Sequence, residues 1–220
     1  MEEQIIRLPK VINSKIVSST VSDIGRSFTP DFTVDDDNKF LYNHMIKWVL
    51  ADDRIESNDI ENPQRKVKGF VNGNVYIAGN TGCGKTMCVK IMMKLSQKEN
   101  IKYAIGDYLF DFVWATVRAD RICDYFMQHG DLYDFMNEPI LAIDDLGAEN
   151  QESIYMGNRV HVLRQLLEYR LDRADKLTII TSNLPINADE FMDKYGSRVV
   201  SRLQRCNYYE LKGIDRRKRK

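Results

Sequence analysis

Short apolar runs alternate with stretches of helical spacing along most of the chain. Runs rich in β-branched and aromatic residues predict five strands: NVYIA (74–78), KYAIGDY (102–108), PILAID (139–144), LTIIT (177–181) and NYYEL (207–211). Apolar residues three or four positions apart predict helices over 85–97, 109–128 and 153–173. Apolar strands that alternate with helices are typical of a largely parallel sheet covered on both faces. The pattern therefore predicts an α/β fold.

The first third of the chain follows a different pattern. Residues 1–37 mix short apolar pairs with Ser, Thr and Asp without a sustained period, so we expect an N-terminal arm there. Asp37 or Asn38 is a suitable N-cap for a helix over 39–51, which carries an apolar face. A polar loop follows at 52–68. We therefore divide the chain into an arm, residues 1–37, and one domain, residues 38–220, that includes helix 39–51.

Composition narrows the class of protein further. The 220 residues suffice for one well-buried domain, and 32 basic against 32 acidic residues give a formal net charge of zero. Four scattered cysteines form no CxxC pair, which argues against a structural zinc site and a disulfide framework. No run of about 18 apolar residues occurs, so we expect no membrane association and a cytoplasmic location.

A glycine-rich turn follows the strand at 74–78. GNTGCGKT, residues 79–86, matches the pattern GxxxxGK[ST] between a predicted strand and a predicted helix. Such a loop turns backbone N–H groups toward phosphate oxygens at a helix N-terminus. We expect Lys85 to reach the β- and γ-phosphates of ATP or ADP and Thr86 to bind Mg²⁺. The predicted nucleotide contacts are Gly79, Asn80, Thr81, Gly82, Cys83, Gly84, Lys85, Thr86 and Met87. Cys83 has no neighbouring base in sequence and is not expected to be a catalytic thiol.

Polar residues end two further strands. PILAIDDLG (139–147) ends in two acids, of which Asp144 is expected to hold the magnesium shell and Asp145 to polarise water. LTIITSN ends in Asn183, whose side chain is placed to orient the attacking water. With the phosphate loop, these residues predict a site for nucleotide hydrolysis.

The set GNTGCGKT, LAIDDLG, TIITSNLP and YGSRVVSRL resembles the AAA+ ATPases, and within them the DnaC and IstB group. The resemblance covers about residues 70–220. It implies a three-layer sandwich around a five-stranded, mainly parallel sheet, and Walker A, Walker B and sensor 1 roles for the motifs above. Only 17 residues follow Leu203, which matches members that lack the C-terminal helical lid.

The resemblance also implies an arginine finger. RVVSR places Arg198 and Arg202 in the segment that supplies it, with Arg202 slightly preferred. A guanidinium donated by a neighbouring subunit would stabilise the transferring phosphoryl group, which implies a homo-oligomer with shared sites. The sequence departs from the family pattern at two places. Asp145 replaces the commoner Glu, so we expect slow hydrolysis, with Glu149 as a second residue that contributes to the activation of water. The ending LKGIDRR has Asp215 in place of Ser in the group's GxSxR pattern, with Arg217 as the matched arginine.

The segment Glu152–Tyr155 resembles the part of DnaC-like loaders that contacts single-stranded DNA. Ser153 offers a hydroxyl for a phosphate and Tyr155 a ring for stacking on a base, although a helix N-cap and a packed tyrosine explain the same residues. Arg118 and Arg121, on the predicted helix 109–128, are expected to join them, while Phe110 and Trp114 are expected in the core. The basic residues 216–220 are typical of a solvated terminus.

Three functions fit these features. The first is a DNA-replication helicase loader that binds single-stranded DNA and a replicative helicase. The second is a transposition helper of the IstB type, an ATPase acting on double-stranded DNA. The third is a small-molecule P-loop kinase, against which Asn183 and RVVSR argue.

Overall fold

The computed structural model describes residues 4–150, 152–155, 158–213 and 215–216. Its main sheet runs in the order β3-β2-β12-β4-β11-β8-β7. The five strands from β12 to β7 pair in parallel, and β2 and β3 add an antiparallel edge. Their bounds are Glu56–Asn58 (β2), Lys66–Lys68 (β3), Val75–Gly79 (β4), Ala115–Arg118 (β7), Ile140–Leu146 (β8), Leu177–Ser182 (β11) and Asn207–Leu211 (β12). The predicted α/β fold with a mainly parallel sheet is confirmed.

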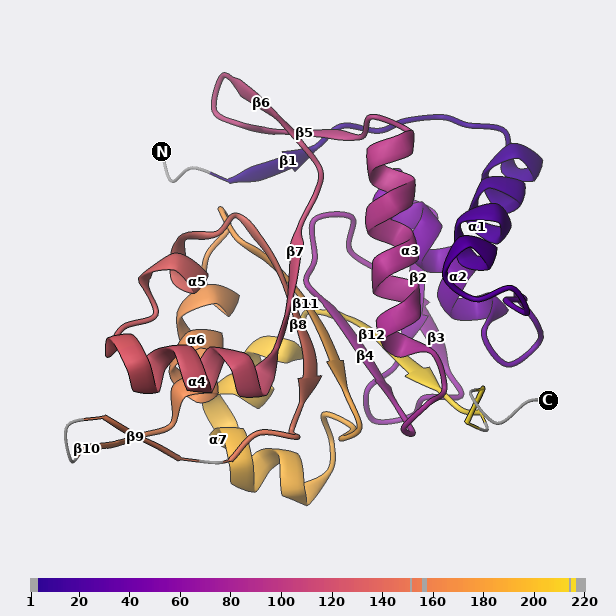
Figure 1. Ribbon diagram of the computed structural model, residues 1–220. Coiled ribbons are helices and arrows are strands. Elements are labelled where there is room, and N and C mark those ends of the chain that lie inside the picture. The colour runs from indigo at the N-terminus through magenta and orange to yellow at the C-terminus, as the bar shows by residue number, and fades with distance from the viewer. Residues whose placement is uncertain (1–3, 151, 156–157, 214, 217–220) are drawn as a thin grey trace.

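Helices cover both faces of this sheet (Figure 1). One face carries α1 (Ser14–Phe28), α2 (Lys39–Val49) and α3 (Lys85–Lys98), and the other carries α4 (Ala119–His129), α5 (Tyr133–Asn137), α6 (Val162–Leu171) and α7 (Asp189–Leu203). Successive strand residues point to opposite layers, because Ile77 and Ile179 join the core under α1–α3 whereas Tyr76 and Ile180 join the core under α4–α7. The three-layer arrangement follows from this alternation.

One strand of the parallel sheet was predicted wrongly. Residues Lys102–Ile105 (β5) and Tyr108–Asp111 (β6) form a separate antiparallel sheet with β1 (Ile5–Arg7), and β7, which was not predicted, is the strand that pairs with β8. The predicted helix 109–128 accordingly begins only at Ala119. Phe110, Phe112 and Trp114 repeat every second residue, which is strand spacing. Trp114 is buried as predicted, but Phe110 is 43% exposed.

The N-terminal segment is more regular than the sequence analysis predicted. It contains β1 and the 15-residue helix α1, whose first turn is capped by the Asn13 side chain accepting from the backbone of Lys15. Val17, Val21 and Gly25 are buried at four-residue spacing, and α1 packs on α3. Serines between the apolar positions hide this period. The division between an arm and an ATPase domain stays a prediction.

The predicted helix 153–173 also begins later than expected. Ser153–Tyr155 (β9) and Asn158–Val160 (β10) form an antiparallel pair, and α6 begins at Val162. Of the apolar residues at helical spacing in 153–173, Leu163 and Leu167 are buried in α6, and Met156 lies outside the described residues. The alternative interpretation of Ser153 as a helix N-cap does not fit, because this residue belongs to a strand.

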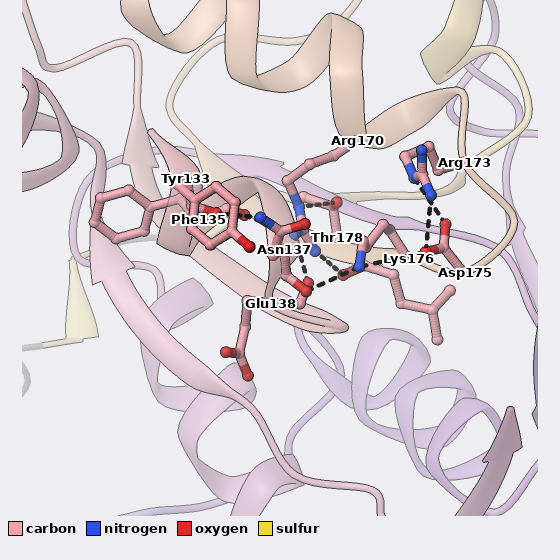
Figure 2. Close-up of polar contacts among 10 residues, drawn as sticks. Tyr133, Phe135, Asn137, Glu138, Arg170, Arg173, Asp175, Lys176 and Thr178 are labelled. Carbon is pink, nitrogen blue, oxygen red and sulfur yellow. Dashed lines mark hydrogen bonds and ion pairs between the residues drawn. The ribbon is translucent and has the colours of Figure 1, made fainter. Parts of the chain in front are cut away.

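A buried arginine fixes α5 against the N-terminal ends of β8 and β11 (Figure 2). Arg170, fully buried in α6, donates to the backbone oxygens of Phe135 (2.8 Å), Glu138 (2.6 Å) and Leu177 (2.8 Å). Lys176 donates to the oxygen of Asn137 at 2.8 Å. These cations satisfy carbonyls that the end of a helix leaves without partners.

In the part of the chain that the structure describes, no helix combines the length and apolar character needed to cross a membrane.

Stability is expected to fall in acid because of His44. Its Nδ1 accepts from the backbone of Glu56, and burial together with Lys47 lowers its pKa from 6.5 to about 4, outweighing the Glu56 carboxylate. Between these pH values His44 is protonated in the unfolded chain and neutral in the folded chain. The free energy of unfolding therefore decreases as pH falls from 6.5 towards 4. Urea-unfolding midpoints measured across this window should decrease, and less steeply for His44→Asn, which keeps an acceptor without titrating.

Candidate nucleotide-binding site

The phosphate loop lies between β4 and α3, as the sequence predicted. Gly82 has φ +79° and Gly84 has φ +107°, conformations that residues with a Cβ rarely adopt. Gly84 is also the N-cap of α3, a helix of 14 residues. The loop therefore presents its backbone at a helix N-terminus, where anions are stabilised.

Lys85 joins this loop to the end of β11. Its Nζ donates to the backbone oxygens of Gly79 (2.7 Å) and Asn80 (3.0 Å) and to Oδ1 of Asn183 (2.8 Å). Burial lowers the pKa of Lys85 from its ordinary value. The structure thus brings together two predicted site residues that lie 98 positions apart in sequence.

Asp144, near the end of β8, accepts hydrogen bonds from two hydroxyl groups. Thr86 Oγ1 donates to Asp144 Oδ1 at 2.7 Å, and Thr181 Oγ1 donates to the same oxygen at 2.6 Å. Adjacent hydroxyl and carboxylate oxygens are the donors that Mg²⁺ prefers, so the residues fit the predicted metal site. The sequence analysis missed Thr181, although its position two residues before Asn183 at a strand end was an available signal.

Asp145 lines the cavity beside the phosphate loop and has an unusual backbone conformation. Its φ of +56° lies in the left-handed region, and its N–H donates to Thr181 Oγ1 at 3.0 Å. Its carboxylate lies 3.5 Å from Nη1 of Arg118, which also pairs with Asp120. Asp120 chiefly, with Asp145 adding a smaller effect, raises the pKa of Arg118. Arg118 therefore lies at the end of β7 beside the site, not on a helix as predicted.

Glu149, predicted as a second residue for the activation of water, bonds instead to Tyr195, Gly147 and Lys194. Its Oε1 accepts from the hydroxyl of Tyr195 at 2.6 Å, and its Oε2 accepts from the backbone of Gly147 at 2.8 Å. Lys194 pairs with the same carboxylate at 3.4 Å. The geometry therefore favours Asp145 as the carboxylate available to water.

A cavity of about 470 Å³ opens beside the phosphate loop and is lined by it and by Asp145. Its volume suits a small ligand. The cavity is also lined by Thr29, Asp31, Phe32 and Thr33 of the N-terminal segment and by Asn38 and Tyr42 at the start of α2. The sequence analysis did not foresee this contribution, because it assigned residues 1–37 to an arm.

The end of the chain reaches the same cavity. The backbone of Arg216 donates to the Gly82 oxygen at 2.9 Å, and its guanidinium pairs with Asp35 at 2.7 Å. A methyl group on Gly82 would lie 2.0 Å from Oδ1 of Asp215, so this carboxylate lies against the phosphate loop. Arg217, the matched arginine of the expected ending, lies outside the described residues.

The two arginines of α7 differ in their surroundings. Arg202 forms a two-pronged ion pair with Asp172 and donates to the Arg198 backbone oxygen at 3.1 Å. The side chain of Arg198 is exposed and makes no hydrogen bond or ion pair within the described residues. The geometry therefore favours Arg198 over Arg202, the residue preferred from sequence, as an arginine free to act on another subunit.

The predicted DNA contacts are only partly accessible. Ser153 is 3% exposed, so the predicted phosphate contact of its hydroxyl does not fit this structure. Tyr155 is half-buried, with its ring 5.9 Å from that of Phe126. Arg121 is exposed on α4, near Asp124. Contacts of Tyr155, Arg118 and Arg121 with DNA stay predictions.

The parallel sheet, the phosphate loop and the strand-end Asp144 define a P-loop nucleotide-binding domain. The family model described as "ATPase family associated with various cellular activities (AAA)" matches residues 75–208. Because this match covers more than half of the chain, the protein belongs to the AAA family, whose members bind nucleotide and are ATPases.

Solved structures share the fold at low sequence identity. A candidate primosome component from Streptococcus pyogenes serotype M3 is 16% identical, with a TM-score of 0.55 over 90% of this chain and 98% of that one. DnaI is 18% identical, with a TM-score of 0.54 over 86% of this chain and 92% of its own. The replication initiator DnaA bound to AMPPCP and single-stranded DNA is 16% identical, with a TM-score of 0.53 over 83% of this chain and 49% of its own. A search of curated proteins found no match.

Replacing Lys85 tests the nucleotide site directly. We expect Lys85→Ala to weaken binding of a fluorescent ATP analogue at least about 100-fold, because a charge-assisted contact with two phosphates is lost. Lys90→Ala is the matched control, since Lys90 is exposed on the same helix. Equal affinity of the Lys85→Ala and Lys90→Ala proteins would contradict the assignment.

Proposed function

We propose that this protein is an ATP-hydrolysing helicase loader that binds single-stranded DNA and a replicative helicase. The observation that carries the proposal is the contact of Lys85 with Asn183 and of Asp144 with Thr181 at the nucleotide site, combined with Arg198 on α7, which is exposed and makes no ion pair among the residues that the structure describes. Likeness in fold to DnaI and to a DnaC helicase loader (15% identity, TM-score 0.50, 83% of this chain and 94% of that chain) supports the choice of partner.

Hydrolysis on this proposal uses residues from three strand ends. The phosphate loop and Lys85 bind the phosphates, and Asp145 accepts a proton from the attacking water, which Asn183 orients. Thr86 and Asp144 would hold Mg²⁺, which when bound would neutralise charge on the phosphate oxygens. Arg118, at 3.5 Å from Asp145, holds that carboxylate by an ion pair. An aspartate held in this way suits slow, assembly-dependent hydrolysis better than rapid turnover.

Assembly completes the site on this proposal. Arg198 of one subunit reaches the nucleotide of its neighbour, where a guanidinium stabilises charge on the transferring phosphoryl group. ATP then favours a homo-oligomer, and hydrolysis weakens it. In a ring or spiral of subunits, Arg118 at the end of β7 and Arg121 on the adjoining α4 would contact the DNA backbone.

The Asp145→Asn protein, which should bind ATP without hydrolysing it, tests the partners. We expect it to bind single-stranded DNA and to capture a hexameric replicative helicase with ATP and not with ADP. Fluorescence anisotropy and affinity capture measure the two interactions. If the protein neither binds single-stranded DNA nor captures a helicase, the loader proposal is overturned. Preference for duplex DNA together with capture of a transposase would favour an IstB-like helper. Phosphate transfer to a metabolite would favour a kinase.

Mixed subunits test the shared site. We expect Asp145→Asn and Arg198→Ala each to lower steady-state hydrolysis at least about 100-fold, whereas Arg202→Ala should act mainly on stability through the lost pair with Asp172. Equal mixing of the first two proteins should restore about a quarter of wild-type hydrolysis, the fraction of neighbouring pairs that combine an intact carboxylate with an intact arginine. A mixture without recovery would show that Arg198 does not act between subunits.

A further inference from the structure

A buried polar cluster joins the hydrolysis site to α7. It consists of Glu149, from the loop after β8, together with Lys194 and Tyr195 of α7. The Glu149 side chain is only 2% exposed and that of Lys194 is 15% exposed. Tyr195 is 1% exposed, and burial followed by the Glu149 carboxylate raises its pKa well above the usual range. The tyrosine therefore stays a hydroxyl donor.

The cluster holds both the side chain and the backbone of the loop. Tyr195 donates to Glu149 Oε1 at 2.6 Å, while Lys194 donates to the backbone oxygens of Gly147 and Glu149, each at 2.7 Å. Glu149 closes the loop by accepting from the Gly147 backbone. Since Gly147 follows Asp145 by two residues, these bonds connect α7 to the strand end that carries the hydrolysis carboxylates.

The helix changes direction immediately after this cluster. Gly196 has φ +80° and ψ 164°, which divides α7 into two helical parts. A Cβ on Gly196 would lie 3.1 Å from the guanidinium carbon of Arg164, so α6 occupies the space beside the break. The second part carries Arg198 and, in its last turn, Arg202, which forms an ion pair with Asp172 after α6.

The Glu149 cluster and the Arg202–Asp172 pair therefore hold α7 on both sides of Arg198. The cluster holds the residues just before the Gly196 break to the strand-end loop, and the Arg202–Asp172 pair holds the second part of the helix to the residue that follows α6. Arg198 lies between these anchors and is exposed. Removing either partner of a buried ion pair leaves a buried charge without compensation, so the contact between Glu149 and Lys194 is costly to break when the loop shifts.

We propose that Glu149, Lys194 and Tyr195 are positioning residues that couple a subunit's own Asp144–Asp145 strand end to the Arg198 it presents to its neighbour. This inference rests on the proposed function, because it requires Arg198 to act between subunits. A change at one nucleotide site then alters the arginine delivered to the next site. The cluster does not touch the nucleotide itself.

Tyr195→Phe in a donor subunit tests this coupling. The donor carries Asp145→Asn, so its own site is inactive and only its Arg198 is measured. The acceptor carries Arg198→Ala and is otherwise intact. We expect the donor with Asp145→Asn and Tyr195→Phe to support at least about fivefold less recovered hydrolysis than the donor with Asp145→Asn alone. Tyr125→Phe in the donor is the matched control and should leave recovery unchanged, because Tyr125 bonds to Asp134 on the exposed side of α4.

Moving the same substitution to the acceptor separates coupling from a general structural role. Tyr195→Phe combined with Arg198→Ala in the acceptor should reduce recovery less than it does in the donor. Equal losses in both positions, or no loss in the donor, would overturn the inference. If the Tyr195→Phe donor fails to fold, judged by thermal melting and by binding of a fluorescent ATP analogue, Lys194→Gln replaces it. Failure of the reference mixture of Asp145→Asn with Arg198→Ala would instead contradict the proposed function.

Discussion

The hydrogen bonds from Thr86 and Thr181 to one oxygen of Asp144 hold the nucleotide site together. Thr86 lies in the first turn of α3, Asp144 lies near the end of β8 and Thr181 lies near the end of β11, so a single carboxylate oxygen fixes three elements relative to one another. The parallel order of β4, β11 and β8 brings these ends to one edge of the sheet. Lys85 and Asn183 add a second connection across the same edge.

Two sets of contacts connect this edge of the sheet to the rest of the chain. Towards the N-terminus, the segment before α2 completes the wall of the cavity, and Asp35 pairs with Arg216 beside the phosphate loop. Towards the other face, Glu149 links the strand end to α7 and its arginines. On our account, nucleotide binding is therefore sensed by both the N-terminal segment and the surface offered to a neighbouring subunit.

The structure brings together the site residues that the sequence analysis selected, whereas several elements around them differ from the prediction. The phosphate loop, Asp144 and Asn183 were selected because each follows an apolar strand and carries a side chain with defined chemistry, and their roles stay predictions. Helix α1 was missed since serines separate its apolar positions, and β7 was missed because the aromatic residues before Arg118 were counted at helical spacing. Thr181, Arg118 and Glu149 depend on which strands and helices become neighbours, and one sequence carries little information about that.

Dependence of hydrolysis on protein concentration tests the central claim most directly, namely that the nucleotide site is completed by a second subunit. The rate per chain should be measured at saturating ATP and single-stranded DNA, over concentrations that span assembly as followed by light scattering. We predict that the rate per chain rises steeply with assembly and then reaches a plateau. A rate per chain that is the same for monomers and assemblies would contradict the account.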